Sequence, residues 1–349
     1  MTSERRGPPS FAFFLCKRGE YCFTSITFSP LHLPSPLHLN HSHLSLTRHS
    51  TALAAIAALA LLAAPAHAIM AGAPPDSPAA RVDPNTTTSP WAGVGSLIVN
   101  GGTFSAVAIG PRHVLTAAHV VGDPAHMRFQ LNFGTDASHV IPVSHVYKHP
   151  GFTGFNPQKP MDDLAVVELS EVLPADVPIY PLHHEDVSPG TEFVMVGYGA
   201  SGTGDVGVTV GANAAIKRVG RNIMDLFGAD QAGRKLVFLF DFDGGEEPNL
   251  MGGRTLGNDV ETTFAVGDSG SPSFVCEHGF WANCWFGHWA VAGINTFVSA
   301  PKESSAKPGT FGTVGGGVLV APYVDWIEHA MSESNGAGAA PAPDAQKPQ

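Results

Sequence analysis

Short strand-like runs separated by turns occupy most of this sequence and restrict it to a β-rich fold. Each run is a few residues long, rich in Val, Ile, Leu or Phe, and bounded by Gly, Pro, Asn or Asp. The chain holds 39 Gly and 29 Pro, and only 14% of its residues are charged, which disfavours long amphipathic helices. Residues 200–262 show the fewest recognisable patterns. We predict strands over residues 95–99, 103–109, 113–116, 128–133, 140–147, 164–169, 193–196, 236–240, 273–276, 289–297 and 317–320.

The predicted strands fall into two groups. Residues 173–189, rich in Pro and acidic side chains, separate the groups, which indicates two small barrels with a cleft between them. Apolar residues recur at the spacing of one helix face over residues 323–332, the one convincing helix. From residue 336 to residue 349 the chain is rich in Ala and Pro, and we expect disorder there.

The N-terminal part of the chain has the features of an export signal. Residues 51–64 are apolar but shorter than the roughly 20 residues that cross a bilayer as a helix. Small residues follow and end at Ala68, which predicts cleavage there and a mature chain that begins at Ile69. Residues 1–45 are an unusually long preface to a signal peptide, so we place the true translation start near residues 44–46. We therefore expect a secreted or periplasmic protein without a membrane anchor in its mature form.

Charge and cysteine content narrow the partners and the folding environment. Asp and Glu number 30 against 19 Lys and Arg, so the formal net charge is −11, and removal of the largely basic leader makes the remainder more acidic. An acidic surface argues against nucleic acid and anionic membranes as partners. After the leader only Cys276 and Cys284 remain, and a close pair in an exported chain predicts one local disulfide.

Two groups of residues are alternative candidates for metal sites. Zinc is one option for two cysteines and two histidines, but their spacing suits structural zinc poorly. Calcium is the other option for an acidic segment, but that segment lacks a complete ligand loop, so an acidic solvated turn is favoured. The zinc set is Cys276, His278, Cys284 and His288, and the calcium set is Asp241, Asp243, Glu246 and Glu247.

The sequence Gly-Asp-Ser-Gly-Ser-Pro at residues 267–272 carries the strongest chemical signal. Glycines on both sides of Ser269 favour a tight turn in which no neighbouring side chain covers its hydroxyl. Small neighbours also let two backbone N–H groups converge beside that hydroxyl, where they can stabilise an oxyanion. A serine hydroxyl alone is a poor nucleophile, so a base and an orienting acid must come from elsewhere in the chain.

His119 and Asp163 are the candidate base and acid. His119 follows two alanines at the end of a predicted strand, which leaves its imidazole unobstructed. Asp163 begins an apolar strand, where a carboxylate is costly unless a partner such as a His N–H satisfies it and fixes the tautomer of that imidazole. Taken singly, a His in such a turn is usually structural and such an Asp is usually a turn former. Asp162 is the competing acid.

Together these residues resemble the trypsin/chymotrypsin family of serine endopeptidases. His119, Asp163 and Ser269 stand in the order of that family, and the resemblance covers the mature chain to Glu328. We expect a bacterial secreted member of this family. Further similar segments are Pro90-Trp91, Ser96-Leu97, Gly197-Tyr198-Gly199, Gly293-Ile294, Gly317-Val318 and residues 323–327.

The resemblance implies a peptidase domain over residues 69–335. Its fold is all-β, with two six-stranded antiparallel barrels at about residues 69–180 and 190–322 and a C-terminal α-helix over residues 323–332. By the resemblance, Ser269 attacks the scissile carbonyl of a protein or peptide substrate, and His119 takes its proton and later gives it to the leaving amine. Asp163 orients His119, and the N–H groups of Gly267 and Ser269 form the oxyanion hole. Protein inhibitors are further expected partners, and no cofactor is implied.

The predicted mature N-terminus has a role in this family as well. A new Ile amino group there folds inward and pairs with the Asp that precedes the nucleophile. Ile69 and Asp268 take these two places here, and cleavage after Ala68 would create the terminus directly. The alternative is that Ile69 stands at this position by coincidence.

Specificity follows from the positions that correspond to the family's primary pocket. Thr263 stands at its base, where a carboxylate would favour Arg or Lys. Val298 stands where the family often has Gly, which narrows the pocket and implies small or medium uncharged side chains. Ser271 replaces the usual second Gly of the nucleophile turn. The family's disulfide beside the catalytic His is absent, because Phe104 and Val120 occupy its positions. The predicted pocket residues are Thr263, Thr296, Phe297, Val298 and Gly317.

Two other functions compete with peptide hydrolysis. A protease-like binding protein would keep the fold without turnover, but such proteins usually lack a triad residue and this chain has all three. An esterase of another fold places its acid and His after the Ser, and the order of residues here argues against it.

Overall fold

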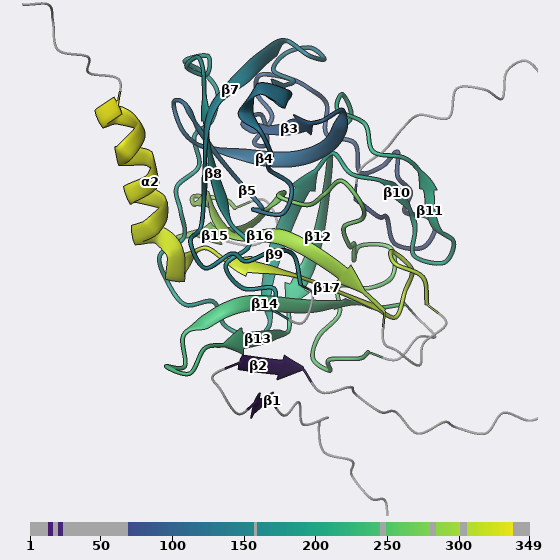
Figure 1. Ribbon diagram of the computed structural model, residues 1–349. Coiled ribbons are helices and arrows are strands. Elements are labelled where there is room, and N and C mark those ends of the chain that lie inside the picture. Colours follow the sequence, from purple (N-terminus) through teal and green to yellow (C-terminus); the bar gives the residue numbers. More distant parts are fainter. Residues whose placement is uncertain are drawn as a thin grey trace, which may run out of the picture.

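The computed structural model describes residues 13–16, 20–23, 69–156, 159–244, 249–279, 284–300 and 306–337. Strands dominate these ranges (Figure 1), which confirms the expected all-β class. The predicted signal segment, Glu246, Glu247 and the end of the chain from residue 338 lie outside the described residues. Two short strands near the start of the sequence, β1 (Phe13–Cys16) and β2 (Glu20–Phe23), pair with each other. No helix in the described ranges is both long and apolar enough to span a membrane.

The first half of the molecule is a closed antiparallel barrel. Its strands follow one another in the order β3-β4-β5-β8-β7-β6, and a short 3-10 turn, η1 (Pro124–His126), precedes β6. Buried side chains of these strands fill the barrel, and Gly95 leaves space for the ring of Phe129, which lies 2.3 Å from where a Cβ would stand. The strands are β3 (Val94–Val99), β4 (Gly102–Gly110), β5 (His113–Thr116), β6 (Met127–Leu131), β7 (His139–Lys148) and β8 (Ala165–Leu169).

The second half is a curved antiparallel sheet of seven strands, where we expected a closed barrel of six. The difference arises at one end, because β13 pairs with β14 through a tight turn and forms an extra edge. β12 and β14 approach through single hydrogen bonds, such as Asn222 Nδ2 to Asp241 O at 2.9 Å, without a regular ladder. The strands in sheet order are β12 (Arg218–Met224), β9 (Thr191–Gly197), β15 (Pro272–Glu277), β16 (His288–Ser299), β17 (Thr313–Leu319), β14 (Lys235–Phe242) and β13 (Leu226–Ala229).

Aromatic rings fill the core of the second half, and glycines on the facing strands make room for them. The ring of Phe238 lies against Gly293 and Gly317, and the ring of Phe240 lies against Gly315, each closer than a Cβ would permit. The sequence patterns did not predict β12, β13 or the hairpin of β10 (Ser201–Thr203) and β11 (Gly207–Val210), because this region is rich in Gly and charged residues.

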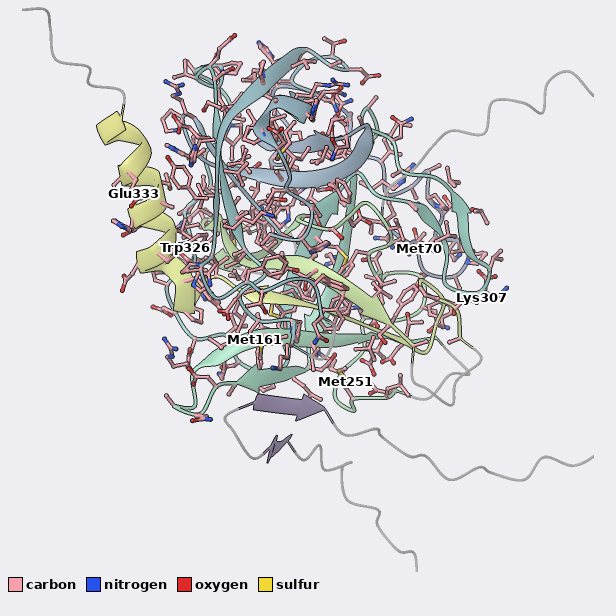
Figure 2. The ribbon with its side chains drawn as sticks, in the orientation of Figure 1. Met70, Met161, Met251, Lys307, Trp326 and Glu333 are labelled. Carbon is pink, nitrogen blue, oxygen red and sulfur yellow. A yellow bond between two sulfur atoms is a disulfide. The ribbon has the colours of Figure 1, made fainter. Side chains whose placement is uncertain are left out.

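The segment before the first barrel lies against the second half. Met70 pairs with Thr263 and Ala71 pairs with Thr203, so Met70 lies beside the β10–β11 hairpin (Figure 2). The first barrel itself therefore begins at β3, later than the boundary near residue 69 that we expected.

The C-terminal helix returns the chain to the first barrel. Helix α2 (Val324–Ala337) follows the 3-10 turn η3 (Ala321–Tyr323) and lies along the outside of the first half, near β7 and β8 (Figure 1). It runs beyond residue 332 and includes residues 336 and 337, which we had assigned to a disordered tail. Met331 of α2 lies over Gly110 on β4, 2.7 Å from where a Cβ would stand.

Candidate active site

His119 and Asp163 meet at one end of the first barrel. β5 ends at Thr116 and pairs with β8 at Ala165, so the residues just beyond these positions lie side by side. His119 N donates to Asp163 Oδ1 at 2.8 Å, and His119 Nδ1 lies 2.7 Å from Asp163 Oδ2. The Asp163 carboxylate is buried, and it accepts one backbone N–H and one imidazole N–H from His119. These two bonds fix the orientation of the imidazole ring.

The serine turn packs against the segment that carries His119. A Cβ on Gly270 would stand 2.0 Å from Thr116 Oγ1 and 3.1 Å from Ala117 N, so only glycine fits at position 270. Gly270 has a φ of 83°, which glycine adopts without strain. Ser269 is half-buried, and its carbonyl accepts the Ser105 N–H at 3.1 Å. The structure therefore packs the serine turn of the second half against the segment of the first barrel that leads to His119.

Ser105 on β4 joins the two halves at this point. Besides its N–H bond to Ser269 O, its hydroxyl donates to Gly267 O at 3.3 Å and accepts the Tyr198 N–H at 3.0 Å. Its carbonyl accepts the Thr116 hydroxyl at 2.8 Å. One residue of the first barrel therefore contacts the serine turn, the second half and the strand before His119.

The N–H groups of Gly267 and Ser269 are the predicted oxyanion hole. Within the described ranges neither group donates to a protein acceptor, whereas the neighbouring Asp268 and Gly270 N–H groups bond to Ala265 O and Asn295 O. Gly267 has a φ of 96°, and this turn conformation leaves both N–H groups available to an external oxygen.

Asp268 is fully buried and bonded to the chain start that we predicted. Its carboxylate accepts the backbone N–H groups of Gly199 at 2.8 Å, Ala265 at 3.0 Å and Ile69 at 3.3 Å. Burial raises the pKa of Asp268 to about 7, and these N–H groups and the charge of Arg218 oppose the rise. Ile69 is fully buried with a φ of 53°, which is strained for a β-branched residue.

Asn295 forms a buried polar network beneath the nucleophile that the sequence did not reveal. Its side chain donates to Ser271 Oγ at 2.8 Å and accepts the Ser273 hydroxyl at 2.7 Å, while its backbone accepts Gly270 N–H at 2.9 Å. The serine at position 271, which replaces the family's usual glycine, thus has a specific partner. The sequence signal that could have indicated this network is a polar residue, Asn295, within the largely apolar run 289–297.

Asp162, the competing acid, points away from His119 to another cluster. Its Oδ1 accepts the Tyr323 hydroxyl at 3.0 Å and lies 3.4 Å from His149 Nδ1, and its N–H donates to the same hydroxyl at 3.2 Å. Asp162 has a φ of 65°, a left-handed conformation unusual for a residue other than glycine. Tyr323 therefore fixes the strained residue next to Asp163.

A half-exposed aromatic ring covers one face of the candidate base. The centroid of the Phe155 ring lies 4.8 Å from that of the His119 ring, at an interplanar angle of 49°. Phe155 belongs to the Gly- and Pro-rich segment between β7 and β8, and no sequence pattern indicated this contact. The ring shields one face of His119 from water.

The predicted pocket residues fall into two groups. Thr296, Phe297, Val298 and Gly317 belong to the paired strands β16 and β17, whereas Thr263 lies beside Met70. Thr296 is the extra residue of a bulge in β16, and the Phe297 ring lies 2.5 Å from where a Cβ on Gly316 would stand. Gly317 lies beneath the core ring of Phe238. Thr263 is buried and accepts the Met70 N–H, and its hydroxyl has no hydrogen-bond partner among the described residues. Val298, next to Phe297, is half-buried.

Cys276 and Cys284 form a disulfide with an S–S distance of 2.04 Å, as predicted. The zinc alternative fails because both thiol ligands are consumed. His183 and His288 instead contact the Glu277 carboxylate. The described residues contain no group of three or more His, Cys, Asp or Glu side chains arranged to hold a metal ion.

The acidic segment is buried, where we expected a solvated turn. Asp241 and Asp243 are 3% and 5% exposed and lie near Asp225 and Glu261. Burial and mutual repulsion raise the pKa of Asp225 to about 8 and that of Asp243 to about 7.

Comparison with known proteins agrees with this architecture. The Trypsin family model matches residues 82–231, a range that includes His119 and Asp163. No curated protein matches the chain. The family match over residues 82–231, the closed antiparallel barrel, the second β-sheet and the C-terminal helix together support a trypsin/chymotrypsin-like serine protease family for this chain.

Proposed function

We propose that this protein is an exported serine endopeptidase that cleaves peptide bonds through an acyl-enzyme. The carrying observation is the pair of bonds from His119 to Asp163, at 2.8 and 2.7 Å, beside a serine turn that packs on the same segment. Asp163 holds Nδ1 of His119 protonated, so that Nε2 accepts the Ser269 proton as the hydroxyl attacks the carbonyl. His119 then protonates the leaving amine, and water releases the acyl group by the same steps.

The oxyanion hole supplies the main electrostatic stabilisation in this proposal. The unused N–H groups of Gly267 and Ser269 bind the oxygen that becomes negative when Ser269 attacks. Loss of one such donor costs about 2.7–4 kcal/mol of transition-state stabilisation in a related enzyme mechanism. The hydrogen bonds of Asp268 and Asn295 hold the turn in the conformation that presents both groups.

Export and activation are coupled in this proposal at Ile69. Signal cleavage after Ala68 frees the Ile69 amino group, whose nitrogen already lies 3.3 Å from the Asp268 carboxylate. Cleavage also releases the strain at Ile69, because φ is no longer constrained by a preceding peptide group. The mature protein acts outside the cytoplasm on protein or peptide substrates.

We further propose small or medium uncharged residues before the cleaved bond. The support is that Thr263 carries no charge and that Val298 stands where the family often has Gly on the pocket wall. A cleavage profile on a peptide library tests this preference, and strong cleavage after Arg or Lys would contradict it.

Labelling with a fluorophosphonate probe tests the proposed function and separates it from a binding protein without turnover. We expect Ser269 to be labelled and peptide hydrolysis to be lost in Ser269→Ala and in His119→Ala. Ser188→Ala is a matched control, because Ser188 is exposed and lies outside the site. Hydrolysis that persists in Ser269→Ala, or a wild-type protein that is neither labelled nor active, would refute the proposal.

A further inference from the structure

Arg218 is a buried cation that the proposed mechanism does not use. It lies on β12 with 0% exposure, and its Nε donates to Pro78 O at 2.6 Å. Neither Nη1 nor Nη2 has a hydrogen-bond partner among the described residues. A guanidinium withdrawn from water requires a compensating negative charge nearby.

The strand register places Arg218 on the face that holds Asp268. Arg218 pairs directly with Gly197 of β9, and residues opposite each other in an antiparallel pair project to the same face. A Cβ on Gly197 would stand 2.2 Å from Asp268 Oδ1. Two residues further along β12, on the same face, a Cβ on Gly220 would stand 2.8 Å from Ile69 Cγ2. Arg218, Asp268 and Ile69 therefore share one buried compartment.

Arg218 supplies positive charge to this compartment before any cleavage. Asp268 receives three neutral backbone N–H groups, from Gly199, Ala265 and Ile69, and Arg218 is the charged side chain that lowers its pKa. In return, Asp268 raises the pKa of Arg218, opposing the effect of burial. The guanidinium remains charged at neutral pH.

We propose that Arg218 is an internal counter-charge for Asp268 that holds the serine turn in its working conformation while Ile69 is still joined to the preceding residue. This inference rests on the proposed function, because it concerns regulation of the same site. It gives the uncut chain a basal activity, and release of the Ile69 amino group then adds a second positive charge that raises this activity. Arg218 is a positioning residue, since it acts through Asp268.

The first test measures how fast a fluorophosphonate labels Ser269 in the full chain as a function of pH, with the N-terminus determined by mass spectrometry. The variants are Arg218→Met, Arg218→Lys and Lys217→Met. Lys217 is the matched control, because it is an adjacent buried cation whose carboxylate partner is Asp83, at 3.0 Å.

Arg218→Met should slow labelling of the uncut chain about fivefold or more at pH 7. The pKa of Asp268 is about 7, so about half of Asp268 is ionised at this pH. If loss of Arg218 raises that pKa by about one unit, the ionised fraction falls to about a tenth. The acid limb of the profile should move up by about one pH unit. Arg218→Lys should keep the wild-type profile, and chains that start at Ile69 should lose less. A wild-type profile for Arg218→Met, an equal shift in Lys217→Met, or an equal loss in cut and uncut chains would each overturn the proposal.

The second test needs no activity and therefore separates this inference from the proposed function. Urea unfolding of Arg218→Met, Asp268→Asn and the double variant gives a double-mutant cycle. Arg218→Met should be much more destabilising when Asp268 is present than in the Asp268→Asn background, and additive effects would refute the coupling. Lys217→Met should cost the same in both backgrounds. If Arg218→Met does not fold, recovery by Asp268→Asn supports the proposal and failure of the double variant contradicts it. A wild-type chain that is never labelled refutes the proposed function alone.

Discussion

Tyr323→Phe tests whether the 3-10 turn before the C-terminal helix positions Asp163, the proposed triad acid. The change removes one hydroxyl that accepts Asp162 N–H at 3.2 Å and donates to Asp162 Oδ1 at 3.0 Å. Burial and the nearby Asp162 raise the pKa of Tyr323, so this hydroxyl is protonated at every working pH and both bonds are present. Asp162, with its φ of 65°, would then lose the contact that holds it in a strained conformation next to Asp163.

The expected cost follows from the contacts removed. Two hydrogen bonds contribute about 0.5–1.5 kcal/mol each, and a buried group left without a partner costs about 1–3 kcal/mol, so we expect a loss of about 1–3 kcal/mol. Relaxation of the strain at Asp162 would turn Asp163 away from His119 and lower kcat more than it raises KM. Urea unfolding measures the first effect and steady-state peptide hydrolysis measures the second.

Tyr180→Phe is the matched control for this prediction. The Tyr180 hydroxyl also makes two bonds in the first half, donating to Pro90 O at 2.7 Å and accepting Gly93 N–H at 3.2 Å, but it does not touch the site. We expect a similar loss of stability with kcat unchanged. If both variants lower kcat equally, or if Tyr323→Phe leaves kcat and stability at wild-type values, the positioning argument is wrong.

Three further predictions concern other parts of the molecule. Asn295→Val should destabilise the protein by about 1–3 kcal/mol in urea, because it leaves buried serine hydroxyls unsatisfied, and retained stability would contradict the network. Reduction of Cys276–Cys284, which are eight residues apart, should lower the free energy of unfolding by about 2–3 kcal/mol, and an unchanged midpoint in reductant would contradict this. Since the folded pKa values of Asp225 and Asp243 lie near 8 and 7, above those of the unfolded chain, stability should fall as pH rises from about 4 to 8. Asp243→Asn should flatten that fall, and an equally steep profile would contradict the shift.

Features set by local chemistry could be predicted from the sequence. The glycines at 267 and 270 indicated a turn around Ser269 because few other residues adopt their φ values. The apolar strand after Asp163 indicated that its carboxylate needs a partner, and the order of His, Asp and Ser indicated the family. The disulfide followed from two nearby cysteines in a chain that has the sequence features of an export signal.

Features set by strand register could not be predicted. Asn295 meets Ser271 and Ser273 only because β15 and β16 pair with a bulge, and residue spacing alone does not show where a bulge falls. Arg218 lies in a charged, Gly-rich region whose pattern predicted no strand, so its burial opposite Gly197 was invisible. Asp241 and Asp243 were expected in a solvated turn, but their segment belongs to a strand and its end, with both side chains buried.

The contacts of Ser105 impose an order on when this protein can become active. During synthesis the first barrel is complete long before the residues of the serine turn emerge, and at that stage His119 and Asp163 have no hydroxyl to activate. The turn gains its contacts to the first barrel when the second sheet docks on β4, where Ser105 bonds to Ser269, Gly267 and Tyr198. Under the proposed function a half-made or half-folded chain is therefore inert toward its neighbours, and the capacity to cut other chains arises with the last step of assembly.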